Sequence, residues 1–188
     1  MTGTRAIGNG GRGNRLRPFI WAGAACLLLL PAVAMQFENT GVNWSAGDFI
    51  VMGVMLAVLC GLYELGAWLS GNSAYRAGFG VAALAGFLTI WVNLAVGMLG
   101  DEGGIANMMF LGVLFIAGAG ALLAGLKPGG MALAMLAAAF AQLVAAGVGL
   151  AMGFQTLEVS LTACFALPWL LSGALFQKAA QDAPASAA

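Results

Sequence analysis

An uncharged apolar stretch in the middle of the chain constrains the fold more than any other feature of the sequence. Residues 77–99 carry no charged side chain; Arg76 precedes them, and the acidic, glycine-rich sequence Asp101-Glu102-Gly103-Gly104 follows. A helix needs about 20 mainly apolar residues to cross a hydrocarbon core about 30 Å thick. The stretch therefore predicts a transmembrane helix with one positive and one negative end.

The composition predicts that lipid faces much of the surface. Of the 188 residues, 62% are hydrophobic and 7% are charged, whereas a soluble domain has about 25% charged residues. Seven acidic and seven basic side chains are too few to cover a soluble surface of this size, so the lipid bilayer is the first expected partner. The net charge of zero gives no electrostatic support for nucleic-acid binding.

Several classes of chemical site are excluded by the residue types present. The chain has no histidine, which excludes imidazole-ligated haem, imidazole zinc sites and triads with a histidine base. Its three cysteines stand alone within apolar segments, without the paired spacing of a metal or redox motif. We therefore expect no cofactor, no metal site and no catalytic residue.

Five further apolar segments accompany the central one, and together they predict an all-α, polytopic transmembrane helical bundle. The six expected spans cover residues 18–37, 47–69, 77–99, 106–126, 131–153 and 157–177. They form a single domain over residues 18–178, and the polar tails at residues 1–17 and 179–188 are expected to be disordered. Pro168 should kink the last span, and the short loops predict that consecutive helices pack as antiparallel neighbours.

The first span has a second interpretation. Its end, Ala32-Val33-Ala34, matches the pattern of a signal-peptidase site, and a basic segment precedes its leucine-rich core. Cleavage there would leave five spans. The apolar residues continue past this site to Phe37, which favours an uncleaved first helix.

The distribution of charge predicts the orientation. With the N-terminus inside, every basic residue falls on the cytoplasmic side, where lysine and arginine accumulate in membrane proteins. These residues are Arg5, Arg12, Arg15, Arg17, Arg76, Lys127 and Lys178. The opposite side holds Glu38, Asp48, Asp101, Glu102 and Glu158. We expect a multi-pass protein with both termini in the cytoplasm.

Glu64 is the one acidic residue well inside an expected span. Ionisable groups at membrane depth are costly and often functional. Arg76 lies across a short inner turn, so we expect a Glu64–Arg76 ion pair near the membrane interface. The alternative is a protonatable or cation-binding carboxylate.

Two amides also fall within spans. Asn93 and Gln142 must find hydrogen bonds in a medium without water, and we expect them to hold helices together. They could instead line a polar pathway. The outer acidic cluster, Asp101 and Glu102, could concentrate cations, or its acids could simply be tolerated on the side from which bases are excluded.

Small residues recur at helical spacing and predict close helix packing, because lipid offers little hydrophobic drive for helices to associate. One stripe runs through Ala137, Ala141, Ala145, Gly149 and Gly153. Shorter ones are Gly78, Ala82 and Gly86; Gly53, Ala57 and Gly61; and Gly112 and Gly120. The helix that covers each stripe could come from the same chain, from a second copy or from another membrane protein.

Several short stretches carry a family resemblance. They are Asp48-Phe49, Tyr63-Glu64, Ser70-Gly71-Asn72, Ala74-Tyr75-Arg76, residues 91–97 (WVNLAVG), Gly100 and Ala106-Asn107. Together they resemble a family of uncharacterised bacterial inner-membrane proteins, over roughly residues 25–145. The resemblance implies a small multispan protein of the inner membrane, and it supplies no activity and no catalytic residues.

Three functions are compatible with these features. The first is an accessory or structural membrane protein that binds other membrane proteins or itself through helix–helix association. The second is a small channel or transporter subunit that uses Glu64, Asn93, Gln142 and the outer acids. The third, an enzyme acting on lipid, is disfavoured because the chain lacks histidine and clustered nucleophiles, so we expect no enzyme.

Overall fold

The computed structural model describes residues 16–38, 40–101 and 103–182. The predicted positions of Arg5, Arg12, Arg15 and Glu102 lie outside these ranges, as does most of the two tails. The described residues form helices, turns and loops, with no strand, and six helical spans are long and apolar enough to cross a membrane. The predicted helical bundle of six spans is confirmed.

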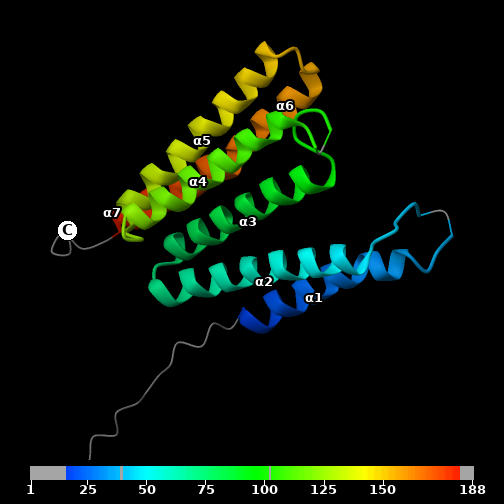
Figure 1. Cartoon of the computed structure of the whole chain (residues 1–188). Coiled ribbons are helices and arrows are strands. Elements are labelled where there is room, and N and C mark those ends of the chain that lie inside the picture. The colour runs from blue at the N-terminus through cyan, green and yellow to red at the C-terminus, as the bar shows by residue number, and fades with distance from the viewer. Residues whose placement is uncertain (1–15, 39, 102, 183–188) are drawn as a thin grey trace, which may run out of the picture.

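The helices follow the expected spans closely (Figure 1). They are α1 (Arg17–Ala34), α2 (Ala46–Leu69), α3 (Ser73–Ala95), the short 3₁₀ helix η1 (Ile105–Asn107), α4 (Met108–Leu123), α5 (Pro128–Ala151), α6 (Thr156–Cys164) and α7 (Ala166–Gln181). Arg17 and residues 179–181, expected in the tails, are helical.

Capping residues explain where several helices begin. Ser45 and Asp48 form a reciprocal capping box at the start of α2, which satisfies backbone N–H groups that have no partner within the helix. Asn72 accepts a hydrogen bond from the backbone N–H of Tyr75. This cap starts α3 four residues earlier than the hydropathy suggests, so Tyr75 and Arg76 lie in its first turn.

The sixth span consists of two helices, α6 and α7, which meet at Phe165. Pro168 has no N–H to donate to the carbonyl four residues earlier, at Cys164, and its ring clashes with that carbonyl. For this reason α6 ends at Cys164, and the predicted kink is confirmed as a break between α6 and α7.

The spatial order of the helices differs from their order in the sequence. By their contacts they run α1, α2, α3, α7, α5, α4, with α7 between α3 and α5. In Figure 1, α4 overlaps α7 in the view. The expectation that all consecutive helices are neighbours is therefore wrong for α3 and α4, because α7 occupies the face of α3 that α4 would need. At the edge, α1 packs against α2 and has no buried residue between Arg17 and Ala34.

Small residues let α7 approach α3 closely. Ser172 donates a hydrogen bond to the carbonyl of Gly78 (2.8 Å), and a Cβ at Gly78 would lie 3.3 Å from the ring of Phe176. Phe176 is fully buried and packs edge-on against Tyr75, with ring centroids 5.2 Å apart. Gly78 of the predicted stripe thus faces α7, and Gly86 lies near Leu114 of α4 and Trp169 of α7.

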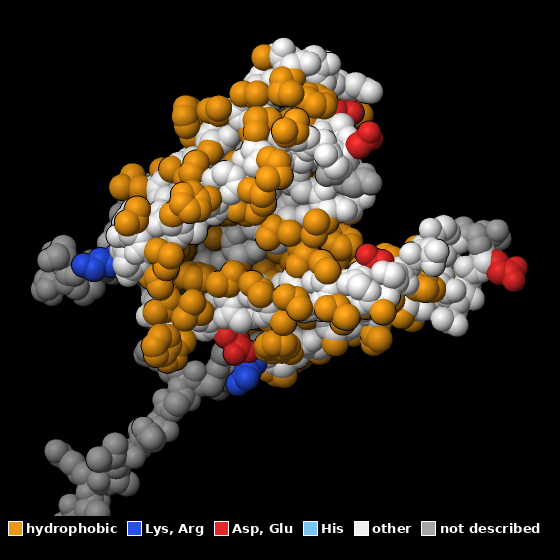
Figure 2. All heavy atoms as spheres, in the orientation of Figure 1, with side chains coloured by type: hydrophobic (Ala, Val, Ile, Leu, Met, Phe, Trp, Pro, Cys, Tyr) orange, Lys and Arg blue, Asp and Glu red, His pale blue; other side chains and the backbone are white. Residues whose placement is uncertain are grey.

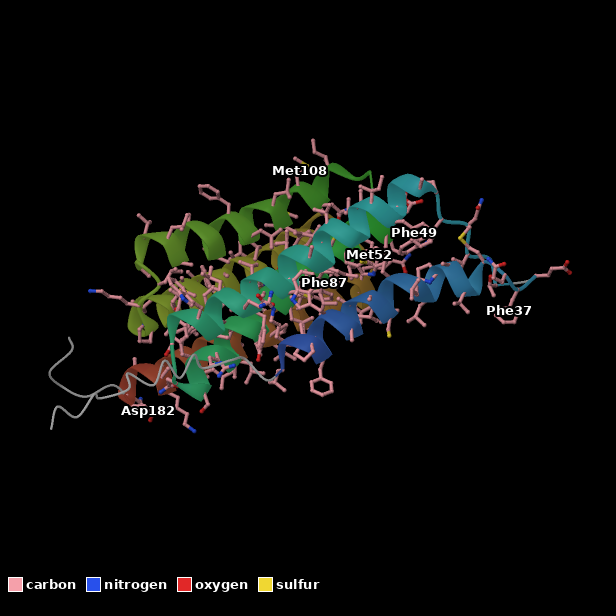
Figure 3. The ribbon with its side chains drawn as sticks, turned by 90° about the horizontal axis from the view of Figure 1, so that it is seen from below. Phe37, Phe49, Met52, Phe87, Met108 and Asp182 are labelled. Carbon is pink, nitrogen blue, oxygen red and sulfur yellow. The ribbon has the colours of Figure 1, made fainter. Side chains whose placement is uncertain are left out.

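Charges separate between the two ends of the bundle, as predicted. Arg17, Arg76, Lys127 and Lys178 belong to helix ends or turns at one end, which we call the basic end. Glu38, Asp48, Asp101 and Glu158 belong to the opposite, acidic end. Figure 2 shows blue side chains toward the left of the view and most red ones toward the right. In Figure 3, Phe37 and Phe49 lie at the acidic end and Asp182 at the basic end.

Candidate functional site

Glu64 binds α1. Its Oε1 lies 2.9 Å from Nε of Arg17 and accepts a hydrogen bond from the indole Nε1 of Trp21 (2.6 Å). The expected pairing with Arg76 is wrong, for a geometric reason. Gly66 faces Phe79 of α3, and two residues turn about 200° around a helix, so Glu64 points away from α3 and toward α1.

This contact fastens the outermost helix. The side chains of Arg17 and Glu64 are 66% and 29% exposed, and exposed ion pairs contribute little to stability. The pair instead contributes to positioning, because it fixes where α1 lies along the length of α2. The geometry favours the structural interpretation of Glu64.

The two amides behave differently. Gln142 is fully buried, and its Nε2 donates to the carbonyl of Thr162 (3.0 Å), which joins α5 to α6 as predicted. The Nδ2 of Asn93 instead donates to the carbonyl of Thr89 in its own helix (2.7 Å), so this bond joins no second helix. Within the described residues, Oδ1 of Asn93 and Oε1 of Gln142 are buried without a partner.

A network of polar groups ties the acidic end together. The hydroxyl of Thr162 donates to the carbonyl of Met98 (2.9 Å), and the backbone N–H of Gly100 donates to the carboxylate of Glu158 (3.2 Å). Together with the bond from Gln142 to Thr162, these contacts bind the segment between α3 and α4 to α5 and α6. We call Met98, Asn107, Gln142, Glu158 and Thr162 the acidic-end network.

Asn107 is the centre of this network. Its Oδ1 accepts from the backbone N–H groups of Met98 (2.9 Å) and Leu99 (3.0 Å), and its Nδ2 donates to the carbonyls of Leu99 (3.3 Å) and Asp101 (2.8 Å). Sequence reasoning noticed Asn107 only through the family resemblance. Its position three residues after the glycine pair Gly103-Gly104 and directly before an apolar segment is the signal that could have marked it as a loop-closing residue.

The predicted polar residues do not come together in one site. Glu64 lies at the α1–α2 contact near the basic end, whereas Asn93 and Gln142 lie in the half of the bundle that leads to the acidic end. The side chain of Asp101 is exposed, and only its backbone carbonyl enters the network. Among the described residues, no group of three His, Cys, Asp or Glu side chains could hold a metal ion.

An open groove runs between α4 and α5. It has a volume of about 500 Å³ and is lined by apolar residues of both helices, including Met109, Gly112, Ile116, Ala137, Phe140, Ala141, Val144 and Val148. The small residues of the α5 stripe do not all have the same surroundings. Gly149 lies against Leu99, while Ala137 is exposed and Ala141 is half-buried in the groove.

A second cavity, the α2–α4 cleft, has a volume of about 380 Å³. Its walls come from α2 and α4, and its floor comes from α3, α5 and Trp169 of α7. In Figure 2 it is the hollow between the upper layer, which contains α4, and the lower layer, which contains α2.

The described geometry is thus that of a membrane bundle with one buried polar network and two apolar hollows. Comparisons with protein-family models, with curated proteins and with solved structures find no match for this chain.

Proposed function

We propose that this protein is an accessory component of a bacterial inner membrane that binds a transmembrane helix of another membrane protein in the α4–α5 groove. One observation carries the proposal: the groove exposes small residues at the spacing that helices use to approach each other. In lipid, such residues drive helix association because they allow close backbone contact.

Several small residues at other close contacts are already covered by parts of this chain. Gly78 faces α7, Gly120 lies close to Ala134 of α5, and Gly149 lies against Leu99. A Cβ at Gly112 would meet no atom within 4 Å. The part of the surface around Gly112, Ala137 and Ala141 therefore has the character of a helix interface without a helix of this chain on it.

The cellular placement is part of the proposal. The family resemblance of residues 25–145 supports a bacterial inner membrane. The gathering of Arg17, Arg76, Lys127 and Lys178 at one end supports cytoplasmic termini, because loops rich in lysine and arginine stay on the cytoplasmic side.

A matched pair of glycine substitutions tests the groove. Gly112→Leu fills it, whereas Gly61→Leu adds the same side chain to an open face of α2, where a Cβ would also meet no atom within 4 Å. Native mass spectrometry of protein gently extracted from its own membrane should show a second protein with wild type and with Gly61→Leu. Gly112→Leu should lose it.

Two other results would point elsewhere. A partner that Gly112→Leu retains would rule out the groove as its binding site, and a dimer that Gly112→Leu dissociates would identify a second copy as the occupant.

The alternative function, a channel or transporter subunit, has less support because Glu64, Asn93 and Gln142 do not share one path. Ion flux into protein-containing vesicles that Glu64→Gln abolishes would favour it.

A further inference from the structure

We propose that the α2–α4 cleft binds one acyl chain of a phospholipid whose headgroup lies at the basic end of the bundle, between Lys127 and Asp182. This site is separate from the α4–α5 groove.

The cleft exists because of the order in which the helices pack. Since α7 separates α3 from α5, the helices that pack on them, α2 and α4, stand apart. The facing residues on the floor and wall are small, among them Ala82, Gly86 and Gly118, and they leave the space between Leu62 and Leu114 unfilled. A membrane protein does not leave such an opening empty, because acyl chains surround it.

A recess of about 480 Å³, lined by apolar residues and by a few polar side chains, lies at the basic end. Leu69, Tyr75 and Gly125 line it together with Asn72, Lys127 and Asp182. It combines one cationic and one anionic side chain, and Nδ2 of Asn72 donates to Oδ2 of Asp182 (3.3 Å). The hydroxyl of Tyr75 is bonded to the carbonyl of Leu126 (2.8 Å), so it holds the turn after α4 against α3.

The recess lies beyond the basic end of the cleft, as two parts of the lining show. On α3 the lining passes from Phe79 in the cleft to Tyr75 in the recess, one turn away, and beside them it passes from Ala121 of α4 to Gly125 in the turn that follows this helix. Along α3, from Tyr75 to Ile90, the two hollows span about 22 Å at 1.5 Å per residue. One leaflet contributes about 15 Å, half of the hydrocarbon core, so a chain that starts at the basic end fits within this length.

The charges of the recess select the headgroup. Lysine beside a membrane surface attracts lipid phosphate, and Asp182 offers a carboxylate to a cation. A headgroup that carries both a phosphate and an ammonium, as in phosphatidylethanolamine, matches the pair better than a purely anionic one does.

Binding to purified protein tests the site directly. Wild type in detergent, titrated with phosphatidylethanolamine and followed by native mass spectrometry, should bind one lipid saturably. Gly118→Phe places a ring in the cleft, at a position where a Cβ meets no atom within 4 Å, and should weaken binding about tenfold. Gly61→Phe, on the open face of α2, should bind as wild type does.

The headgroup is tested with a second lipid. Phosphatidylglycerol, which lacks the ammonium, should bind about fivefold more weakly than phosphatidylethanolamine, the loss expected for one exposed charge pair. Equal binding of the two lipids would overturn the assignment of Asp182. Unchanged binding by Gly118→Phe would overturn the cleft itself.

A measurement on wild type avoids any effect of substitutions on folding. Phosphatidylethanolamine with a photoreactive diazirine midway along one chain should cross-link mainly to residues 54–62 and 114–121. Equal labelling of the outer face of α1 would mean that the lipid is ordinary solvent and would overturn the proposal. Exclusion of the lipid by a second copy of the chain would do the same.

Discussion

At the scale of single residues, Asn107 does more for the fold than its size suggests. It is buried, and its amide makes four hydrogen bonds to the backbone of the segment between α3 and α4. A backbone group that is buried without a partner costs about 1–3 kcal/mol. One side chain thus satisfies several groups that helical structure cannot satisfy in a loop.

Asn107→Ala should lower the free energy of unfolding by about 2 kcal/mol or more, because it leaves the N–H groups of Met98 and Leu99 without their acceptor. Asn93→Ala is the control, since its bond runs to a carbonyl of its own helix, and it should cost about 1 kcal/mol or less. Denaturant unfolding in detergent measures both values. Equal losses would show that the loop does not depend on Asn107.

The sequence predicted the residue contacts only in part. Gln142 was expected to join two helices and does so, because a buried amide must find a partner wherever it lies. The partner of Glu64 was wrong because an ion pair depends on which face of α2 meets α1. Hydropathy gives no such information when every face of a helix is apolar.

At the scale of helices, close contacts depend on individual glycines. A Cβ at Gly66 of α2 would lie 2.6 Å from the ring of Phe79 on α3, too close to be accommodated without movement. Gly61, which belongs to the predicted stripe of α2, has open space beside it. Glycine spacing in the sequence therefore indicates that helices pack closely, but it does not identify the glycine at the contact.

Gly66→Ala should separate α2 from α3 and destabilise the protein by about 1–3 kcal/mol, the usual cost of overpacking. Gly61→Ala, in the same helix, should change stability little or raise it slightly, because alanine favours helix more than glycine does. Thermal unfolding of both variants in one detergent makes the comparison. Equal midpoints for the two variants would contradict the close α2–α3 contact.

The six spans and the break near Pro168 were predictable because they depend on hydropathy and on a missing N–H group, both of which are local properties. The start of α3 was missed by four residues because the cap at Asn72 decides it. The neighbours of α3 were also missed, since loop length favours α4 but the packing of small residues favours α7.

At the scale of the whole molecule, the separation of charges predicts how the protein sits in its membrane. In a variant whose native cysteines are replaced, single cysteines at Thr40 and Gln155 lie at the acidic end and one at Ser73 lies at the basic end. A membrane-impermeant maleimide added to intact spheroplasts should label Thr40→Cys and Gln155→Cys but not Ser73→Cys. The reverse pattern would place the termini outside.

The position of α7 also has a consequence for the order in which the protein can be assembled. A ribosome makes α7 (Ala166–Gln181) after α1 to α6, yet this helix is the shared neighbour of α3 and α5. While the chain grows, the pair α2–α3 and the pair α4–α5 can each form, but the element that joins them has not yet been synthesised. Assembly is therefore completed only after α7 has been synthesised, and a chain interrupted before Ala166 would leave two separate hairpins in the bilayer.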